Sequence, residues 1–262
     1  MIIAQISDMH IVAPGKQLYG VIDTASYLRA AVDALLARNP APDVVLVTGD
    51  LVNAGSAAEY AVLRAQLDRL PFPCRLIPGN HDARDALRAA FPDHAYLGAS
   101  GFIQYVDETF PLRLIGLDSL DDGKVPGLLC RDRLAWLERM LAVSDRPTVI
   151  FVHHPPFLTG MGHMDGQPLA GSDAFAAIVG RYRNVERVMA GHVHRSAQAR
   201  WAGTLASTCP STAHQFVLDL NASDRLDYAL EPPGFQLHVW RENGPLVTHT
   251  VPIGEYATRR LV

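Results

Sequence analysis

The sequence predicts an α/β fold in which helices cover the faces of a β-sheet. Short, almost continuous apolar runs recur along the first two thirds of the chain, and amphipathic stretches of helical length separate them. Apolar runs of this kind are typical of strands that are buried on both faces. Alternation of strands and helices is the pattern from which α/β folds are built.

The expected elements follow in chain order. The predicted strands are residues 2–6, 44–48, 74–77, 113–117, 148–152 and 185–189. The predicted helices are residues 24–38, 57–70, 84–90, 131–143 and 172–182. The first helix is closed by Pro40 and Pro42, and Ser56 with Glu59 forms a capping-box pattern at the start of the second.

From about residue 197 the strand-like runs follow one another without helices between them. They are residues 197–201, 204–208, 215–218, 235–240 and 246–251. Ala202-Gly203 and Asn243-Gly244 are candidate hairpin turns. We therefore expect a β-rich C-terminal part.

Length and composition indicate one substantial core with at most a small appendage. The chain has 262 residues, of which 48% are hydrophobic and 19% charged. Its apolar runs are shorter than the roughly 20 residues that cross a bilayer, and the N-terminus lacks the basic region of a signal peptide. Cys74, Cys130 and Cys209 are widely spaced, which suggests neither a disulfide framework nor a thiolate metal site. We expect a cytoplasmic protein without a membrane partner.

Charge and histidine content narrow the functional classes. The net charge is −4, and no block of Lys and Arg provides the basic surface that a nucleic-acid polymer requires. The chain has 11 histidines, several of them beside Asp, Asn or Gly at the ends of apolar runs. Ligand-bearing loops belong at such positions.

Five segments share one arrangement, in which polar residues of metal-ligand type follow an apolar strand. They are residues 7–10 (Ser-Asp-Met-His), 49–50 (Gly-Asp), 79–82 (Gly-Asn-His-Asp), 153–156 (His-His-Pro-Pro) and 191–194 (Gly-His-Val-His). Carboxylate, imidazole and amide ligands suit divalent Mn, Fe, Co and Zn. Glycine before a ligand lets the backbone turn or approach closely. Each motif alone is more often structural, but five in this order predict a metal centre.

These motifs resemble those of the calcineurin-like metallophosphoesterases, over residues 8–194. Leu18-Tyr19-Gly20, the Gly-Asn-His-Asp segment and Met164-Asp165 are similar to the branch of bacterial glycerophosphodiesterases and class III cyclic-nucleotide phosphodiesterases. The resemblance implies a four-layer αββα sandwich. It divides the chain into a catalytic domain, residues 1–200, and a β-rich part, residues 201–262, that completes the sandwich and mediates dimerisation or caps the site.

The resemblance also implies the ligands of two divalent metal ions. Asp8, His10 and His194 would hold one ion, Asn80, His153 and His192 would hold the other, and Asp50 would bridge them. The implied reaction is in-line attack of a metal-bound hydroxide on a small phosphodiester.

The remaining site residues have proposed supporting roles. Asp50, Asn80 and His81 are the expected catalytic residues: His81 would stabilise the transition state or protonate the leaving alkoxide, unless it only orients a ligand. Asp82 would buttress His81 or cap the following helix, and His154 would fix its loop. The expected rim of the cleft is formed by Tyr19, His163, Met164, Asp165 and His214.

The predicted function is hydrolysis of glycerophosphodiesters, 3′,5′-cyclic nucleotides or both. A phosphomonoesterase or protein phosphatase, a nuclease and a non-catalytic scaffold of the same fold are the alternatives. Trp201, Trp240 and the β-rich tail suggest self-association as a homodimer or higher oligomer, or a tail that folds over its own sandwich.

Overall fold

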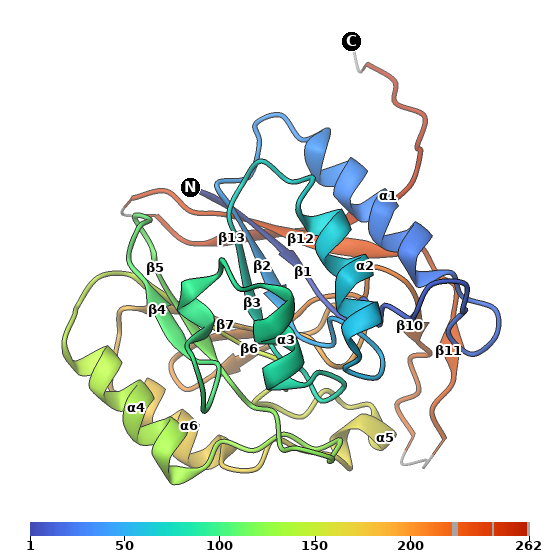
Figure 1. Ribbon diagram of the computed structural model, residues 1–262. Helices are drawn as coiled ribbons and strands as arrows, with labels where there is room; N and C mark the ends of the chain where they lie inside the picture. The colour runs from blue at the N-terminus through green and yellow to red at the C-terminus, as the bar shows by residue number, and fades with distance from the viewer. Residues whose placement is uncertain (222–224, 243, 261–262) are drawn as a thin grey trace.

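Two β-sheets lie between two layers of helices in the computed structural model of the protein (Figure 1). The structure describes residues 1–221, 225–242 and 244–260. The predicted α/β class and its four-layer αββα arrangement are confirmed.

The first sheet has the strand order β13-β12-β1-β2-β3. Its parallel strands are β1 (Ile2–Ile6), β2 (Val44–Thr48) and β3 (Cys74–Ile77). Two C-terminal strands extend the sheet: β12 (Gly234–Val239) pairs antiparallel with β1, and β13 (Val247–Pro252) pairs antiparallel with β12. Strand β12 therefore lies directly beside β1, and the last strand, β13, forms the edge of the sheet beyond it.

The second sheet has the order β4-β5-β6-β7-β9-β8. Its inner strands β5 (Arg113–Leu117), β6 (Thr148–Val152), β7 (Val185–Ala190) and β9 (Thr204–Thr208) are parallel. The edge strands β4 (Tyr105–Asp107) and β8 (Gln198–Trp201) are antiparallel to their neighbours. A separate two-stranded ribbon is formed by β10 (Gln215–Phe216) and β11 (Tyr228–Ala229).

Helices cover the outer face of each sheet (Figure 1). The first sheet is covered by α1 (Thr24–Leu36), α2 (Ala57–Leu67) and α3 (Arg84–Ala90), and the second by α4 (Arg131–Ala142) and α6 (Ser172–Val179). The capping box of α2 is confirmed: the Glu59 amide donates to Ser56 Oγ, and the Ser56 amide donates to the Glu59 carboxylate. Phe151 and Met189, from strands of the second sheet, belong to the same hydrophobic core as the first sheet.

Four short elements were not predicted from the sequence, among them the two-residue β11, whereas the equally short β10 lies within the predicted strand 215–218. The strand β4, the helix α5 (Gly162–Asp165) and the 3₁₀ turn η1 (Ala95–Leu97) have three or four residues, too few for a hydrophobic period to appear. Helix α3 ends at the predicted residue. The other predicted helices end one to three residues earlier than expected, because turns with capping hydrogen bonds take the place of their last residues.

The two predicted turns and the two tryptophans can be placed. Ala202 and Gly203 form the β8–β9 hairpin turn with φ of 48° and 83°, as predicted. Asn243 of the second predicted turn lies outside the described residues. Trp240 is buried in the core of the first sheet, and Trp201 packs against Phe175 at a centroid distance of 4.9 Å. Across the described ranges, no helix is long and apolar enough to cross a membrane.

Candidate metal centre

The seven predicted metal ligands lie together where strands of both sheets end. Asp8 and His10 follow β1, Asp50 follows β2 and Asn80 follows β3 in the first sheet; His153 follows β6, and His192 and His194 follow β7 in the second. All except Asn80 are almost completely buried. Carboxyl ends of parallel strands gather such loops in one place, which explains the convergence of residues that are distant in sequence.

The Asp50 carboxylate lies between two groups of ligands. Its Oδ2 is 3.5 Å from His10 Nε2, and its Oδ1 is 3.4 Å from His153 Nε2. On the first side, His194 Nε2 is 3.0 Å from His10 Nε2 and 3.7 Å from Asp8 Oδ1. On the second side, Asn80 Oδ1 is 3.2 Å from His153 Nε2. This placement suits a carboxylate that bridges two cations.

Hydrogen bonds fix which imidazole nitrogens are available to a cation. His153 Nδ1 donates to the Thr48 carbonyl at 2.8 Å, and His194 Nδ1 donates to the His214 carbonyl at 2.9 Å. Their Nε2 atoms then present lone pairs to neighbouring acceptors, and buried His192 Nε2 has no hydrogen-bond partner. Converging acceptors without hydrogens between them fit a bound cation, and a ligand histidine typically donates through its other nitrogen in this way.

Electrostatics of the buried ligands also fit bound cations. Burial lowers the pKa of His10 and of His192 to about 3, so both imidazoles are neutral and able to coordinate. Burial raises the pKa of Asp8 to about 7. Burial alone would lower the pKa of His153, but the Asp50 and Asp8 carboxylates outweigh it and raise that pKa to about 9. Carboxylates this poorly solvated need compensating positive charge.

Backbone strain is concentrated in the ligand loops. Five of the seven candidate ligands have left-handed φ values, namely Asp8 (54°), His10 (44°), Asp50 (47°), His192 (71°) and His194 (51°). Each such residue costs on the order of 1–3 kcal/mol, and this strain is typical of functional sites. This strain cannot be predicted from the motifs, because glycine is the residue that normally marks a left-handed position and none of these five is glycine.

Close approach of the ligand loops requires glycine before Asp50, Asn80 and His192; a Cβ on Gly49 would lie 2.4 Å from His153 Nδ1. A Cβ on Gly191 would lie 2.0 Å from Ser7 Oγ and 2.8 Å from Asp8 Oδ2. A Cβ on Gly79 would lie 2.3 Å from Asp50 Oδ1. The expectation that glycines before the ligands allow close approach is therefore confirmed here.

His81 lies at the edge of the cluster and lines the cleft above it. Its Nδ1 donates to the Asn53 carbonyl at 2.8 Å, so Nε2 is the nitrogen available to a substrate. Its backbone amide donates to Asp50 Oδ1 at 3.0 Å. The residue therefore holds the central carboxylate through its backbone and presents its ring to the cleft.

The expected role of Asp82 is wrong. Its carboxylate accepts from the amides of Leu51 and Gly79, at 3.1 and 2.8 Å, and from the Tyr60 hydroxyl at 2.9 Å. Helix α3 begins after Ala83 without a side-chain cap. Asp82 thus braces the loop that carries Asp50 instead of supporting His81 or capping the helix.

His154 fixes its loop, as expected. Its Nε2 is 3.0 Å from the Val125 carbonyl, and its Nδ1 is 2.8 Å from Ser119 Oγ. Nε2 must donate to the carbonyl, so Nδ1 accepts from the Ser119 hydroxyl. Because both nitrogens are engaged, His154 is unsuited to coordinate, although it lies near His153 and His192.

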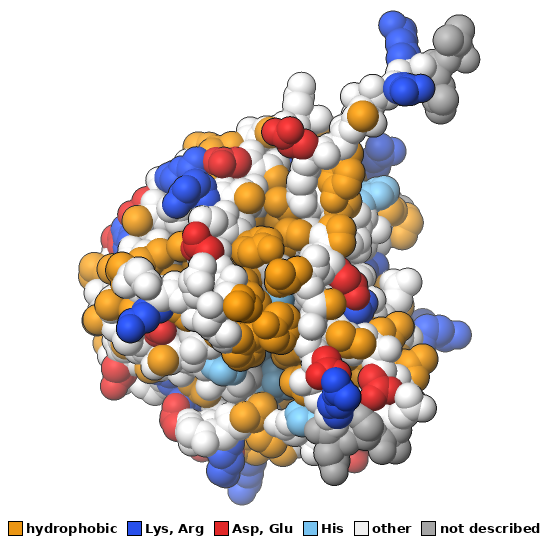
Figure 2. Space-filling view, turned by 90° about the vertical axis from the view of Figure 1, so that its right-hand side faces the viewer, with side chains coloured by type: hydrophobic (Ala, Val, Ile, Leu, Met, Phe, Trp, Pro, Cys, Tyr) orange, Lys and Arg blue, Asp and Glu red, His pale blue; other side chains and the backbone are white. Residues whose placement is uncertain are grey.

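A cleft of about 210 Å³ opens above the ligands. Histidine side chains are visible at the base of a hollow in this face, with hydrophobic side chains gathered beside it (Figure 2). Tyr19, His163 and Met164 line the cleft, as expected. His214 is instead buried beneath the rim, 4.5 Å from the His194 ring, and neither of its ring nitrogens has a hydrogen-bond partner.

Several residues that line the cleft were not predicted from the sequence. Val125, Gln167, Phe216 and Leu226 also line the cleft, and Tyr228 stacks on Tyr19 at 5.0 Å. Each belongs to a loop or to the short ribbon, and none carries a metal-ligand motif. Only their place in the folded chain identifies them.

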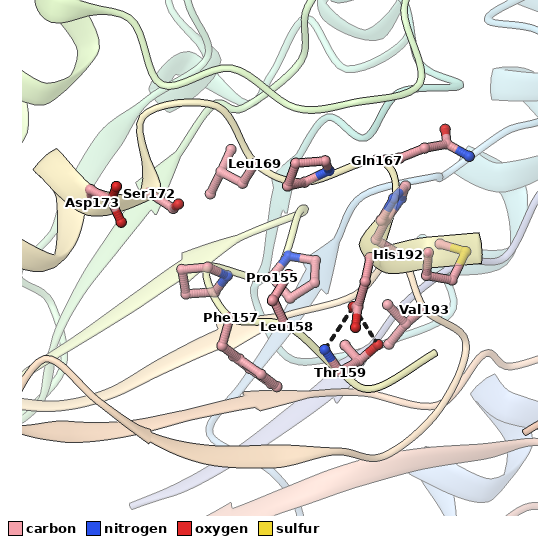
Figure 3. A pocket seen from close by; sticks show the side chains of 14 residues that line it. Pro155, Phe157, Leu158, Thr159, Gln167, Leu169, Ser172, Asp173, His192 and Val193 are labelled. Atoms are coloured by element: carbon pink, nitrogen blue, oxygen red, sulfur yellow. Dashed lines mark hydrogen bonds between the residues drawn. The ribbon is translucent and has the colours of Figure 1, made fainter. Parts of the chain in front are cut away.

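A second cavity of about 180 Å³ adjoins the cleft beneath α5 (Figure 3). Met164, Gln167 and His192 line both spaces. Asp165, expected at the rim of the cleft, lines this second cavity instead. Its Oδ1 accepts from the amide and hydroxyl of Thr159, at 2.7 and 2.9 Å. It therefore holds the preceding loop, and its expected place at the rim of the cleft is wrong.

Comparison with known proteins agrees with this geometry. The chain is 37% identical over 258 residues to a probable glycerophosphodiester phosphodiesterase of Arcobacter nitrofigilis, covering 98% of this chain and 94% of that protein. It is 38% identical over 248 residues to a probable cyclic nucleotide phosphodiesterase of Rhodopseudomonas palustris (93% and 89% covered), and 31% identical over 247 residues to the 3′,5′-cyclic adenosine monophosphate phosphodiesterase of Vibrio vulnificus (93% and 87% covered).

The fold and the family follow from two further comparisons. A crystal structure of a dimetal phosphatase from Danio rerio superposes with a TM-score of 0.70 at 16% identity, covering 97% of this chain and 99% of that one. Residues 1–196 match the family model described as calcineurin-like phosphoesterase. With three quarters of its length matched, the chain belongs to the calcineurin-like phosphoesterase family.

Proposed function

We propose that the protein is a dinuclear-metal phosphodiesterase that hydrolyses glycerophosphodiesters, 3′,5′-cyclic nucleotides or both. The observation that carries this proposal is the Asp50 carboxylate, which lies between two groups of lone-pair donors on opposite sides. The names of relatives that match nearly the whole chain support the same reaction.

Asp8, His10 and His194 would hold one ion, and Asn80, His153 and His192 would hold the other. Asp50 would contact both. The donor set of carboxylate, imidazole and amide suits Mn, Fe, Co or Zn. Two such ions, when bound, polarise a phosphoryl oxygen and make hydroxide available near neutral pH.

Asn80 and His81 would orient the ester and supply a proton to its leaving group. The Asn80 amide group would donate to a phosphate oxygen, since its Oδ1 faces His153. His81 Nε2 faces the cleft and would protonate the leaving alkoxide, because Nδ1 is held by the Asn53 carbonyl. General acid assistance of this type is typically worth about 10²–10⁴-fold in rate.

The lining of the cleft favours a diester over a monoester. Among the described residues that line it, none is Lys or Arg, whereas Tyr19, Phe216 and Leu226 give it an apolar side. A phosphomonoester is a dianion near neutral pH and gains from added positive charge, whereas a diester is a monoanion with a second organic group to pack. A phosphomonoesterase activity of the same centre is the second candidate.

Relative rates on two nitrophenyl esters test the proposal. Metal-stripped protein is supplied with Mn²⁺ and assayed with bis(p-nitrophenyl) phosphate and p-nitrophenyl phosphate. The expected result is metal-dependent activity that favours the diester and is lost in Asp50→Ala. Higher kcat/KM on the monoester would favour the second candidate, and no activity with any divalent metal would leave a non-catalytic scaffold.

The chain is also proposed to form a homodimer or a higher oligomer in the cytoplasm. Leu218, Leu220 and Leu230, near the two-stranded ribbon, are 55–67% exposed, and such apolar side chains favour burial against a second copy. The molar mass in solution, measured by light scattering, tests this. A monomer at all concentrations would contradict it.

A further inference from the structure

The Gln5 side chain is fully buried behind the metal centre and connects the two sheets. Gln5 lies in β1, three residues before Asp8, and is 0% exposed. Its Nε2 donates to Thr48 Oγ1 at 3.0 Å and to the Ala190 carbonyl at 2.9 Å. Thr48 ends β2 and Ala190 ends β7. One amide group therefore ties the ends of three strands that lead into the ligand loops.

The other end of the amide is fixed equally well. Gln5 Oε1 lies 3.1 Å from His238 Nε2, and His238 Nδ1 lies 2.8 Å from Thr248 Oγ1. Because Oε1 only accepts, His238 Nε2 carries the hydrogen, and Nδ1 accepts from the Thr248 hydroxyl. That hydroxyl in turn accepts from Arg187 at 2.6 Å. Each of these hydrogen bonds has one possible donor, so the Gln5 side-chain amide has one orientation.

The same strand ends lie in contact with a ligand from the second sheet. The Thr48 carbonyl accepts from His153 Nδ1 at 2.8 Å and from Ser7 Oγ at 3.3 Å. The Gly191 amide donates to the His153 carbonyl at 2.9 Å. The position of Thr48 relative to Ala190 thus determines where the His153 ring lies relative to Asp50.

We infer that Gln5 is a positioning residue that sets the separation of the two halves of the metal centre. The inference rests on the proposed function and deepens it. Apolar packing between sheets has no preferred direction, whereas the two donated bonds of Gln5 fix the distance between β2 and β7. Residues that orient metal ligands typically contribute about 10–100-fold to metal affinity or activity.

The chain offers a matched control in Gln236, which pairs with Gln5 in the β1–β12 register. It is 2% exposed, and its Nε2 also reaches the second sheet, donating to the Thr208 carbonyl at 3.0 Å and to Ser196 Oγ at 3.1 Å. Thr208 ends β9 and Ser196 follows His194 by two residues, but neither belongs to β2 or β7. Gln236→Met therefore makes the same chemical change without releasing β2 from β7.

Cobalt binding tests the inference without depending on catalysis. Metal-stripped wild type, Gln5→Met and Gln236→Met are titrated with Co²⁺ by calorimetry and by visible absorption. We expect about 10–100-fold weaker binding in Gln5→Met with an altered spectrum. Gln236→Met should stay within about twofold of wild type, even though both variants lose stability because each leaves buried partners unpaired.

A second variant keeps the test decisive if Gln5→Met fails to fold. Thr48→Val keeps the shape of the side chain and removes the acceptor of one Gln5 bond together with a longer bond, 3.4 Å, from the Thr48 hydroxyl to the Ile6 carbonyl. A smaller loss in the same direction is expected. Wild-type affinity and spectrum in the folded Gln5 or Thr48 variant would overturn the inference, as would an equal loss in Gln236→Met. A wild-type protein that binds no divalent cation would overturn the proposed function itself.

Discussion

Single residues decide how closely the ligand loops approach one another. Gly191 precedes His192, and its Cα lies where a methyl group would meet Ser7 and Asp8 from the other sheet. His81 combines a backbone bond to Asp50 with a ring that lines the cleft. Gly191 therefore affects the assembly of the metal centre, and His81 affects the departure of the alcohol in the proposed reaction.

Gly191→Ala should weaken metal binding strongly. The new methyl group would lie 2.0 Å from Ser7 Oγ, so the loops must separate, at a cost of about 1–3 kcal/mol in unfolding free energy. Calorimetric titration with Mn²⁺ measures the loss of affinity. Adding Ser7→Gly to the Gly191→Ala variant removes the closest clashing atom and should restore part of the lost Mn²⁺ affinity. Unchanged affinity in Gly191→Ala would show that the close approach of these loops does not control metal binding.

His81→Ala should affect substrates according to their leaving group. A nitrophenolate departs without protonation, whereas an alkoxide needs the proton that His81 would supply. The predicted loss of kcat is about 10²–10⁴-fold on a glycerophosphodiester and much smaller on bis(p-nitrophenyl) phosphate. Equal losses on both substrates would show that the His81 ring does not protonate the leaving group.

At the scale of elements, each ligand depends on a strand or helix that places its loop. The sequence located most of these elements, because a strand buried on both faces leaves a continuous apolar run. Val44–Thr48 is such a run and is buried throughout. Three-residue β4 and four-residue α5 carry no period that could be recognised. The role of Asp82 depends on Leu51 and Tyr60, which approach from elsewhere in the sequence. Asp165 instead accepts from Thr159 in the loop just before it, a local contact that no motif indicates.

The capping box of α2 offers a test confined to one element. Ser56→Ala removes the acceptor of the Glu59 amide and should lower the free energy of unfolding by about 1 kcal/mol. Urea unfolding measures this change. Mn²⁺ affinity, measured on the same preparation, should be unaffected, because the Ser56 hydroxyl bonds the Glu59 amide of the outer helix, whereas the bond from the Ala54 amide to the Glu59 carboxylate is kept. A large loss of affinity would show that α2 positions the site.

At the scale of the whole molecule, the centre exists only because two sheets meet. Ligand types and their order could be read from the sequence, since each motif follows its own strand. The contacts between the two sheets could not be predicted, because Gln5 and Ala190 are separated by 185 positions and look like ordinary strand residues. The polar contacts between the sheets therefore appear only in the folded chain.

Acid should destabilise the protein partly through His238. Burial lowers the pKa of His238 to about 3, whereas in the unfolded chain it titrates near the ordinary histidine pKa of 6.5. Between these values the unfolded state binds more protons, so stability is present above pH 6.5 and is lost as pH falls towards 3. From pH 7 to 5 this loss is about 2 kcal/mol.

Urea unfolding at pH 7 and pH 5 compares wild type with His238→Gln, which keeps a donor near Gln5 and does not titrate. The variant should lose about 2 kcal/mol less than wild type over this range. An identical pH dependence in the two proteins would show that His238 is protonated in the folded state or does not contribute.

The central claim is that one chain assembles a centre for two divalent ions around Asp50. Its most direct test is the number of Mn²⁺ ions bound per chain, measured by equilibrium titration of metal-stripped protein. We predict two ions per chain in wild type and a loss of both tight sites in Asp50→Ala, which retains its fold by circular dichroism. One ion or none in wild type, or two in the variant, would contradict the account.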